Sequence, residues 1–220
     1  MFVHIGTPKR ITELHSPTRV LNKLGRENVK MVLIDDEDFP YLDLLRQHKF
    51  NIDTLSDIKS LTMLEAYDVV LCDLNGVGKS FSKDYQGAYL VKEIYKRYPF
   101  KIIISYTGIS FDARYNDYLK YADFSVKKDV ASEVWVEKLD LAIDMLSNIE
   151  KRWNRVRDYL LSNSVSLFDV MLLEDNLVDS IEKGNKDEFP SKKLVNNIGG
   201  DLKDILISFA GSAAVRLLIP

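Results

Sequence analysis

Short apolar runs recur along the first two thirds of the chain, and each ends in polar residues. The clearest runs cover residues 30–34, 68–72, 101–105 and 123–126, and a weaker one lies near residues 50–54. Runs of this length with polar ends are typical of buried parallel strands. Apolar residues at helical spacing lie between or after them, at residues 42–45, 61–66, 88–95 and 115–119. This alternation predicts an α/β fold with a doubly wound, five-stranded parallel sheet.

The apolar positions from Val134 to Leu160 follow a strict three-four spacing. This pattern predicts one long helix whose first half covers the sheet. Its second half would leave an apolar seam, over residues 139–160, in need of a partner. The seam could form a homodimer, receive a partner protein or fold back on its own domain.

Two further helical stretches follow the long one. One is expected over residues 166–183, and another runs from 201 toward the end of the chain. We therefore expect three parts: an N-terminal extension at 1–27, a sheet domain at 28–148, and an α-helical C-terminal extension at 149–220.

Composition limits the classes of function. The 220 residues carry 30 basic and 33 acidic side chains, so the net charge of −3 supplies no field that gathers nucleic acid. No uninterrupted apolar stretch reaches the length of a membrane-spanning helix. The single cysteine, Cys72, lies in an apolar run, which is typical of a buried thiol in a reducing compartment. The cytoplasm is the expected location.

Charged side chains stand where the predicted strands end. Asp35 and Asp36 follow the first run, and Asp73 follows the run at 68–72. Because the carboxyl ends of parallel strands share one edge of a sheet, these carboxylates should lie together and bind a hard divalent cation such as Mg²⁺. Lys127 follows a third strand and would attract an anion. With a carboxylate nucleophile, this set predicts phosphoryl transfer to an aspartate.

A hydroxyl completes this predicted site. Ser105 and Thr107 lie on the strand between those of Asp73 and Lys127, and they point to the same face because side chains alternate along a strand. Either could bind a phosphoryl oxygen. We favour Thr107, because Gly108 follows it.

The ordered set of strand ends resembles the receiver domains of two-component response regulators. The resemblance covers residues 28–148 and is carried by the segments LIDDED, VVLCDLNG, ISYTG and ADFSVKK. It implies a receiver, or flavodoxin-like, fold that cycles a phosphoryl group on Asp73 with Mg²⁺. By the same resemblance, Asp35, Asp36, Asp73 and the backbone carbonyl of Asn75 hold the metal. Thr107 is the switch hydroxyl and Lys127 the phosphate-pairing lysine.

Two departures from the family pattern mark this chain. Gly87, which should open the helix after the acceptor, lies 14 residues beyond Asp73, so residues 76–86 contain an insertion. Lys127 is followed by Lys128 where the family has a proline.

The resemblance also implies partners. The phosphoryl donor would be a cognate histidine kinase or another phospho-donor, and the helical extension would act on an output protein. DNA is not the expected target, because acidic residues are frequent after residue 150 and no helix there carries a basic face. No enzymatic activity is expected beyond self-catalysed phosphoryl transfer to Asp73 and its hydrolysis.

Two other functions are compatible with parts of the pattern. One is an interaction module with a receiver fold that no longer cycles phosphate. The other is a phosphatase similar to haloacid dehalogenases, in which a second acidic residue stands two positions after the nucleophile. That position holds Asn75 here, which cannot act as an acid or base in the same way.

Overall fold

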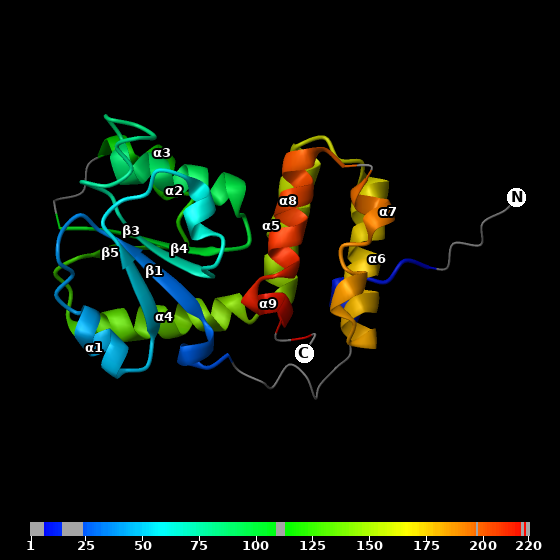
Figure 1. The fold of residues 1–220 in the computed structure, drawn as a ribbon, viewed down its shortest axis with the longest axis horizontal. Coiled ribbons are helices and arrows are strands. Elements are labelled where there is room, and N and C mark those ends of the chain that lie inside the picture. Colours follow the sequence, from blue (N-terminus) through cyan, green and yellow to red (C-terminus); the bar gives the residue numbers. More distant parts are fainter. Residues whose placement is uncertain (1–6, 15–23, 109–112, 197, 217, 219–220) are drawn as a thin grey trace, which may run out of the picture. The chain divides into compact units, whose positions relative to one another are not determined.

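The computed structural model describes residues 7–14, 24–108, 113–196, 198–216 and 218 of the chain. These residues form two compact units. One unit is Leu24–Ser147, and the other combines the N-terminal segment with the residues from Asn148 onward. The first unit contains the sheet and the second is helical (Figure 1).

The sheet has five parallel strands in the order β2-β1-β3-β4-β5. The strands are β1 Lys30–Ile34, β2 Asn51–Leu55, β3 Val69–Asp73, β4 Ile102–Thr107 and β5 Phe124–Lys127. Every residue of β3 is buried, as expected for a central strand covered on both faces. The predicted doubly wound, flavodoxin-like fold is confirmed, and its order reverses between β1 and β3, where such sheets bind ligands.

Helices cover both faces of the sheet. Figure 1 shows α2 and α3 on one face and α1 and α4 on the other. Their bounds are α1 Leu42–Gln47, α2 Gln86–Arg97, α3 Asn116–Leu119 and α4 Ser132–Leu146. On the α4 face, Tyr106 and Trp135 meet edge to face at 5.5 Å, and both rings pack against Phe39 in the same way.

The connection between β2 and β3 differs from the prediction. Residues 61–66 were expected to be helical, but only a single 3₁₀ turn forms there, η3 Leu61–Leu64. The Ser60 hydroxyl caps this turn by accepting a hydrogen bond from the Thr62 amide. Just before it, the Asp57 carboxylate and the Ile58 carbonyl accept hydrogen bonds from the segment after β3, which leaves little chain for a full helix.

The second unit consists of short helices around an aromatic core. They are α5 Ile149–Ser162, α6 Leu167–Lys183, α7 Lys192–Val195, α8 Gly200–Ala210 and α9 Ala213–Arg216, with the 3₁₀ turns η1 Ile11–Glu13 and η5 Lys186–Glu188. The rings of Trp153, Phe189 and Phe209 meet with centroids 6.0 to 6.3 Å apart. Among the helices of the described residues, none is long and apolar enough to span a membrane.

The expected long helix over residues 134–160 is two helices. The chain leaves the helical conformation at Asn148, whose side chain accepts a hydrogen bond from the Lys151 amide and so begins α5. The seam positions on both helices, among them Leu139, Leu146 and Leu160, are buried in the single chain. Of the uses expected for the seam at 139–160, the burial of these positions fits the one in which the chain folds back and fills the stripe itself, which leaves them closed to a second copy.

The N-terminal segment packs on α6. Ile11 is buried, and its amide donates to the Glu174 carboxylate at 2.9 Å. The Lys9 ammonium lies 2.5 Å from Asp179 and 2.6 Å from Glu182. These hydrogen bonds and ion pairs raise the pKa of Lys9. Residues 7–14 therefore belong to the helical unit, although more than 130 residues of chain separate them from it.

Candidate phospho-acceptor site

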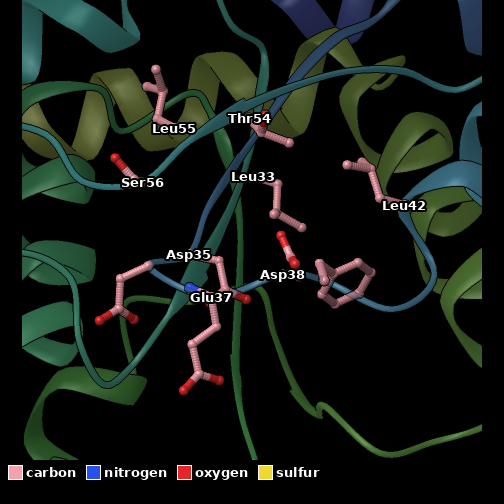
Figure 2. A pocket seen from close by; sticks show the side chains of 10 residues that line it. Leu33, Asp35, Glu37, Asp38, Leu42, Thr54, Leu55 and Ser56 are labelled. Carbon is pink, nitrogen blue, oxygen red and sulfur yellow. Dashed lines mark hydrogen bonds between the residues drawn. The ribbon is translucent and has the colours of Figure 1, made fainter.

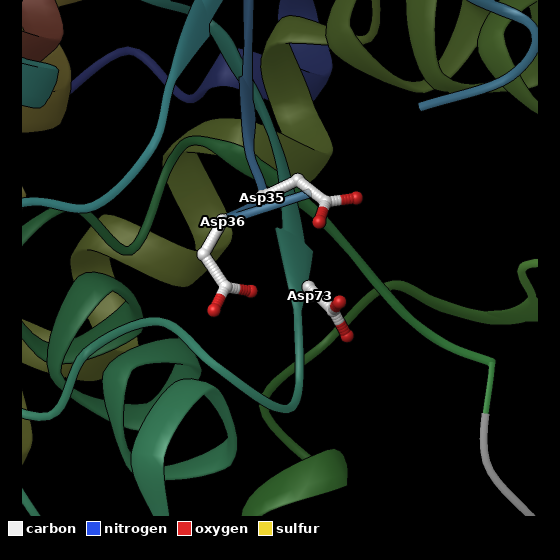
Figure 3. A group of neighbouring side chains, drawn as sticks. All are labelled: Asp35, Asp36 and Asp73. Carbon is white, nitrogen blue, oxygen red and sulfur yellow. The ribbon is translucent and has the colours of Figure 1, made fainter. Parts of the chain in front are cut away.

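Three carboxylates meet at the carboxyl edge of the sheet. Asp35 and Asp36 follow β1, Asp73 ends β3, and one oxygen from each lies within 4.8 Å of the others. Figure 3 shows the three side chains grouped around the end of β3. Asp35 and Asp73 are buried and Asp36 is exposed. The grouping arises because parallel neighbouring strands place their last residues side by side at the switch point of the sheet.

This donor set fits a hard divalent cation. All three side chains offer carboxylate oxygens, which are the ligands that Mg²⁺ prefers, and Asp36 leaves the group open to solvent. A cation would also relieve the repulsion between three negative charges at this distance. The structure therefore brings the three predicted carboxylates together, while their binding of a metal and the part of Asn75 as a ligand stay predictions.

Asp35 is fixed by two donors. The Tyr106 hydroxyl donates to one Asp35 oxygen at 2.9 Å, and the Lys128 ammonium lies 2.9 Å from the same oxygen. Burial raises the pKa of the Tyr106 hydroxyl, and the nearby carboxylates raise it further. Tyr106 therefore stays protonated and acts as a donor. Sequence reasoning missed this contact, although Tyr106 is the register partner of Asp73 on the adjacent strand.

Asp73 lies in a mostly dry environment. Burial raises its pKa to about 6, and the charge of Asp35 adds to this effect. The Asn75 amide, which donates at 3.2 Å, and the Lys128 charge at 3.9 Å both act in the opposite direction. Cys72, the preceding residue, is buried as predicted, and burial raises the pKa of its thiol, which keeps it protonated.

The lysine of the site is Lys128, not Lys127. Lys127 is exposed, while the Lys128 side chain is 14% exposed and pairs with Asp35, Glu37 and Asp73. Burial lowers the pKa of Lys128, but its bond to Asp35 and the charges around it outweigh burial and leave the pKa raised. The error has a simple cause. Side chains alternate along β5, and since Val126 points inward, Lys127 must point the other way and Lys128 returns to the inner face.

Thr107 and Ser105 differ in their partners. The Thr107 hydroxyl accepts a hydrogen bond from the Asn75 side-chain amide at 2.9 Å, and the Asn75 backbone amide in turn binds Asp73. The Ser105 hydroxyl instead lies 2.8 Å from that of Ser125. Thr107 therefore belongs to the hydrogen-bond network of Asp73, whereas the Ser105 hydroxyl forms a hydrogen bond between β4 and β5.

Asn75 also contacts the segment that leads into helix α3. Its side-chain oxygen accepts a hydrogen bond from the Tyr115 hydroxyl at 3.1 Å. Tyr115 ends the turn η4, Ala113–Tyr115, immediately before α3. No sequence pattern indicated this contact, because Tyr115 is 40 residues from Asn75 and its ring was assigned only to a helical pattern.

A cavity of about 440 Å³ adjoins the acidic cluster on the side of β2. Figure 2 shows Leu33, Thr54 and Leu42 at one end and the carboxylates of Asp35 and Glu37 at the other. The cavity therefore combines leucine and threonine side chains at one end with carboxylates at the other.

Several solved structures of receiver domains are similar to this chain. A CheY-like response regulator receiver domain from Methanospirillum hungatei JF-1 has 22% sequence identity, with 54% of this chain and 96% of that chain covered and a TM-score of 0.43. The receiver domain of NtrX from Brucella abortus has 19% identity, coverages of 52% and 98%, and a TM-score of 0.44. A response regulator from Thermotoga maritima has 15% identity, coverages of 53% and 98%, and a TM-score of 0.43.

The fold assignment itself rests on the strand order and strand directions described above. No protein-family model matches the chain, and no curated protein matches its sequence at a significant level.

Proposed function

We propose that the Leu24–Ser147 unit is a phosphorylation-dependent signalling switch, and that the Asp73 carboxylate accepts the phosphoryl group. One observation carries the proposal: three carboxylates and the Lys128 ammonium converge at the carboxyl edge of a parallel sheet, at the point where its strand order reverses. A carboxylate nucleophile beside a cation site and a fixed ammonium is suited to phosphoryl transfer, in which catalysis is mainly positioning and charge stabilisation.

The metal in this proposal is Mg²⁺, held by Asp35, Asp36, Asp73 and the backbone carbonyl of Asn75. When bound, it would neutralise charge on the incoming phosphoryl oxygens. Tyr106 and Lys128 hold Asp35 in place for this role through their contacts with its carboxylate.

The transfer is a displacement at phosphorus. An oxygen of the ionised Asp73 carboxylate forms the new bond to phosphorus, and the bond from phosphorus to the donor's leaving atom breaks with its electron pair on that atom. Lys128 pairs with one phosphoryl oxygen, and the Thr107 hydroxyl turns from Asn75 to donate to another. The donor is a histidine kinase or a small phospho-donor, and the chain's own catalysis is confined to this transfer and to hydrolysis of the product.

Phosphorylation would act on the segment that leads into helix α3. Loss of the hydrogen bond between Asn75 and Thr107 would release Asn75 and its partner Tyr115, which stands at the start of α3. Phosphorylation would thereby shift an existing conformational equilibrium of the segment around Tyr115 and α3. This shift would change how the chain associates with an output protein.

Intact-mass measurement tests the proposal. The full chain is incubated with phosphoramidate with and without Mg²⁺. We expect one added phosphoryl group that requires the metal and is lost in Asp73→Asn. Asp53→Asn is the matched control, because Asp53 is exposed on β2 of the same sheet. If the wild-type chain gains no phosphoryl group, the switch is excluded in favour of a non-cycling receiver-fold module.

The phosphatase alternative has less support. The position that would require an acid or base is Asn75, and its amide is occupied by Thr107 and Tyr115. Steady turnover of a phosphate ester by the chain, lost in Asp73→Asn, would be needed to restore this alternative.

A further inference from the structure

The inserted segment after β3 lies against one of the carboxylates of the acidic cluster. Gly76 has a φ of 82°, and a Cβ there would be 1.9 Å from Oδ1 of Asp36. Three residues later, the Lys79 ammonium lies 4.0 Å from Oδ2 of Asp36. The segment therefore contacts Asp36 twice and brings a second lysine, besides Lys128, to the site.

The backbone on both sides of Lys79 is fixed. The Gly78 amide donates to Oδ1 of Asp57 at 2.7 Å, and the Ser80 hydroxyl donates to the Ile58 carbonyl at 3.2 Å. Val77 is buried. The position of Lys79 is thus set by the fold of the loop, although its side chain remains 56% exposed.

The two lysines at the site are held differently. Lys128 is mostly buried and contacts the buried carboxylate of Asp35 at 2.9 Å. Lys79 is exposed and contacts only the exposed Asp36 among the described carboxylates, at the limit of an ion pair. Exposed pairs of this kind contribute little and break readily, whereas the Lys128 contacts are shielded from water. A cation that needs Asp36 would therefore displace Lys79 and leave Lys128 in place.

Building on the proposed function, we propose that Lys79 is a competing cation that sets the affinity of the acidic site for its divalent metal. A metal ion and the Lys79 ammonium both require the Asp36 carboxylate. After displacement, the ammonium stays tethered nearby by the fixed loop, and its positive charge continues to oppose the metal. The inserted loop would thus weaken metal binding and, through it, limit phosphorylation at low metal concentration.

Binding of Mn²⁺ alone to the full chain tests this inference, with free Mn²⁺ counted by electron paramagnetic resonance. We expect Lys79→Gln to bind Mn²⁺ about two- to tenfold more tightly than the wild type at low ionic strength. Lys79→Arg keeps the charge and should retain the wild-type affinity. Lys83→Gln is the matched control, because Lys83 is exposed in the same loop and forms no ion pair among the described residues.

The salt dependence gives a second readout. The difference between the wild type and Lys79→Gln should shrink at high salt, since the charges involved are exposed. Equal affinities of the wild type and Lys79→Gln at low salt would overturn the inference and leave the proposed function standing. Absence of Mn²⁺ binding by the wild type and every variant would overturn both, because the acidic cluster would then not be a metal site.

Discussion

At the scale of single residues, the acidic site depends on which side chains point inward. Lys128, the first residue after β5, contacts Asp35 and Asp73, whereas Lys127, the last residue of β5, is exposed. The two residues are chemically identical neighbours, so they form an internal control for the role of the ammonium.

Replacement of these two lysines tests the corrected assignment. Lys128→Ala should lower the rate of phosphoryl transfer from phosphoramidate by at least about tenfold, because it removes the ammonium that neutralises charge near Asp73. Lys127→Ala should change that rate by less than about twofold. The rates are measured by intact mass over time. An equal loss in both variants would contradict the geometry described here.

Lys101 provides a separate prediction about stability and pH. It is buried just before β4, and its ammonium donates to the backbone carbonyls of Glu65 and Tyr67. Burial lowers its pKa to about 8, although the charges of Asp68 and Glu65 partly oppose this shift. The unfolded chain therefore binds more protons than the folded chain between about pH 8 and the ordinary lysine pKa of 10.5.

Stability should consequently rise with pH across this interval. Relative to Lys101→Met, the free energy of unfolding of the wild-type chain should increase by about 2 kcal/mol from pH 7.5 to pH 10. The wild type and Lys101→Met are each unfolded with urea at every pH. The difference between their free energies of unfolding cancels the contributions of the other titratable groups, which both chains share. A difference that stays flat or falls with pH would show that Lys101 is not held in a dry environment.

At the scale of elements, helix α2 packs closely against the end of β3. Gly87, in its first turn, faces the end of β3, and a Cβ at that position would lie 1.8 Å from the backbone carbonyl of Asp73. Only glycine permits this approach. The helix therefore fixes the backbone of Asp73, the proposed acceptor, directly.

Gly87→Ala should accordingly separate α2 from β3. We expect it to lower the free energy of unfolding by at least about 2 kcal/mol, because backbone atoms must move to admit the methyl group. Gly108→Ala is the control in the same unit, since its Cβ would meet only Lys128 at 3.7 Å, an ordinary contact. The protection of β3 amides from hydrogen exchange measures the loss of stability in both variants. Equal protection in the two variants would contradict the close packing.

The alternation of apolar runs was enough to predict every strand, because buried strands carry their own signal in the sequence. The position of Asp73 at a strand end followed from the same pattern. The break at Asn148 was missed because α4 and α5 keep the same apolar phase across it. The short turn at Leu61–Leu64 was missed because the residues just before it, Asp57 and Ile58, bind a loop that is distant in sequence.

At the scale of the whole molecule, the chain builds its second unit from both of its ends. Ile11 is buried in that unit and is bound to α6 through its amide. No periodic pattern marks residues 7–14, so their place could not be predicted from sequence. The stability of the helical unit should therefore depend on residues 7–14, which precede the sheet unit in the chain.

Ile11→Ala tests this dependence. Loss of a buried isoleucine side chain should destabilise the helical unit by about 2 to 3 kcal/mol, whereas Ile207→Ala, at a half-exposed position on α8, should cost under about 1 kcal/mol. Hydrogen exchange resolved by peptide follows α5 and α6 separately from the strands. If Ile11→Ala leaves α6 as protected as in the wild type, the N-terminal segment does not stabilise this unit.

The central claim is that Asp73 accepts a phosphoryl group, and locating that group in the chain tests it most directly. An aspartyl phosphate is reduced by borohydride to homoserine, whereas phosphoserine and phosphohistidine are not. After incubation with phosphoramidate and Mg²⁺, reduction and peptide sequencing by mass spectrometry should find homoserine at position 73. Homoserine at any other position, or a phosphoryl group on a serine, threonine or histidine with Asp73 unchanged, would contradict the account.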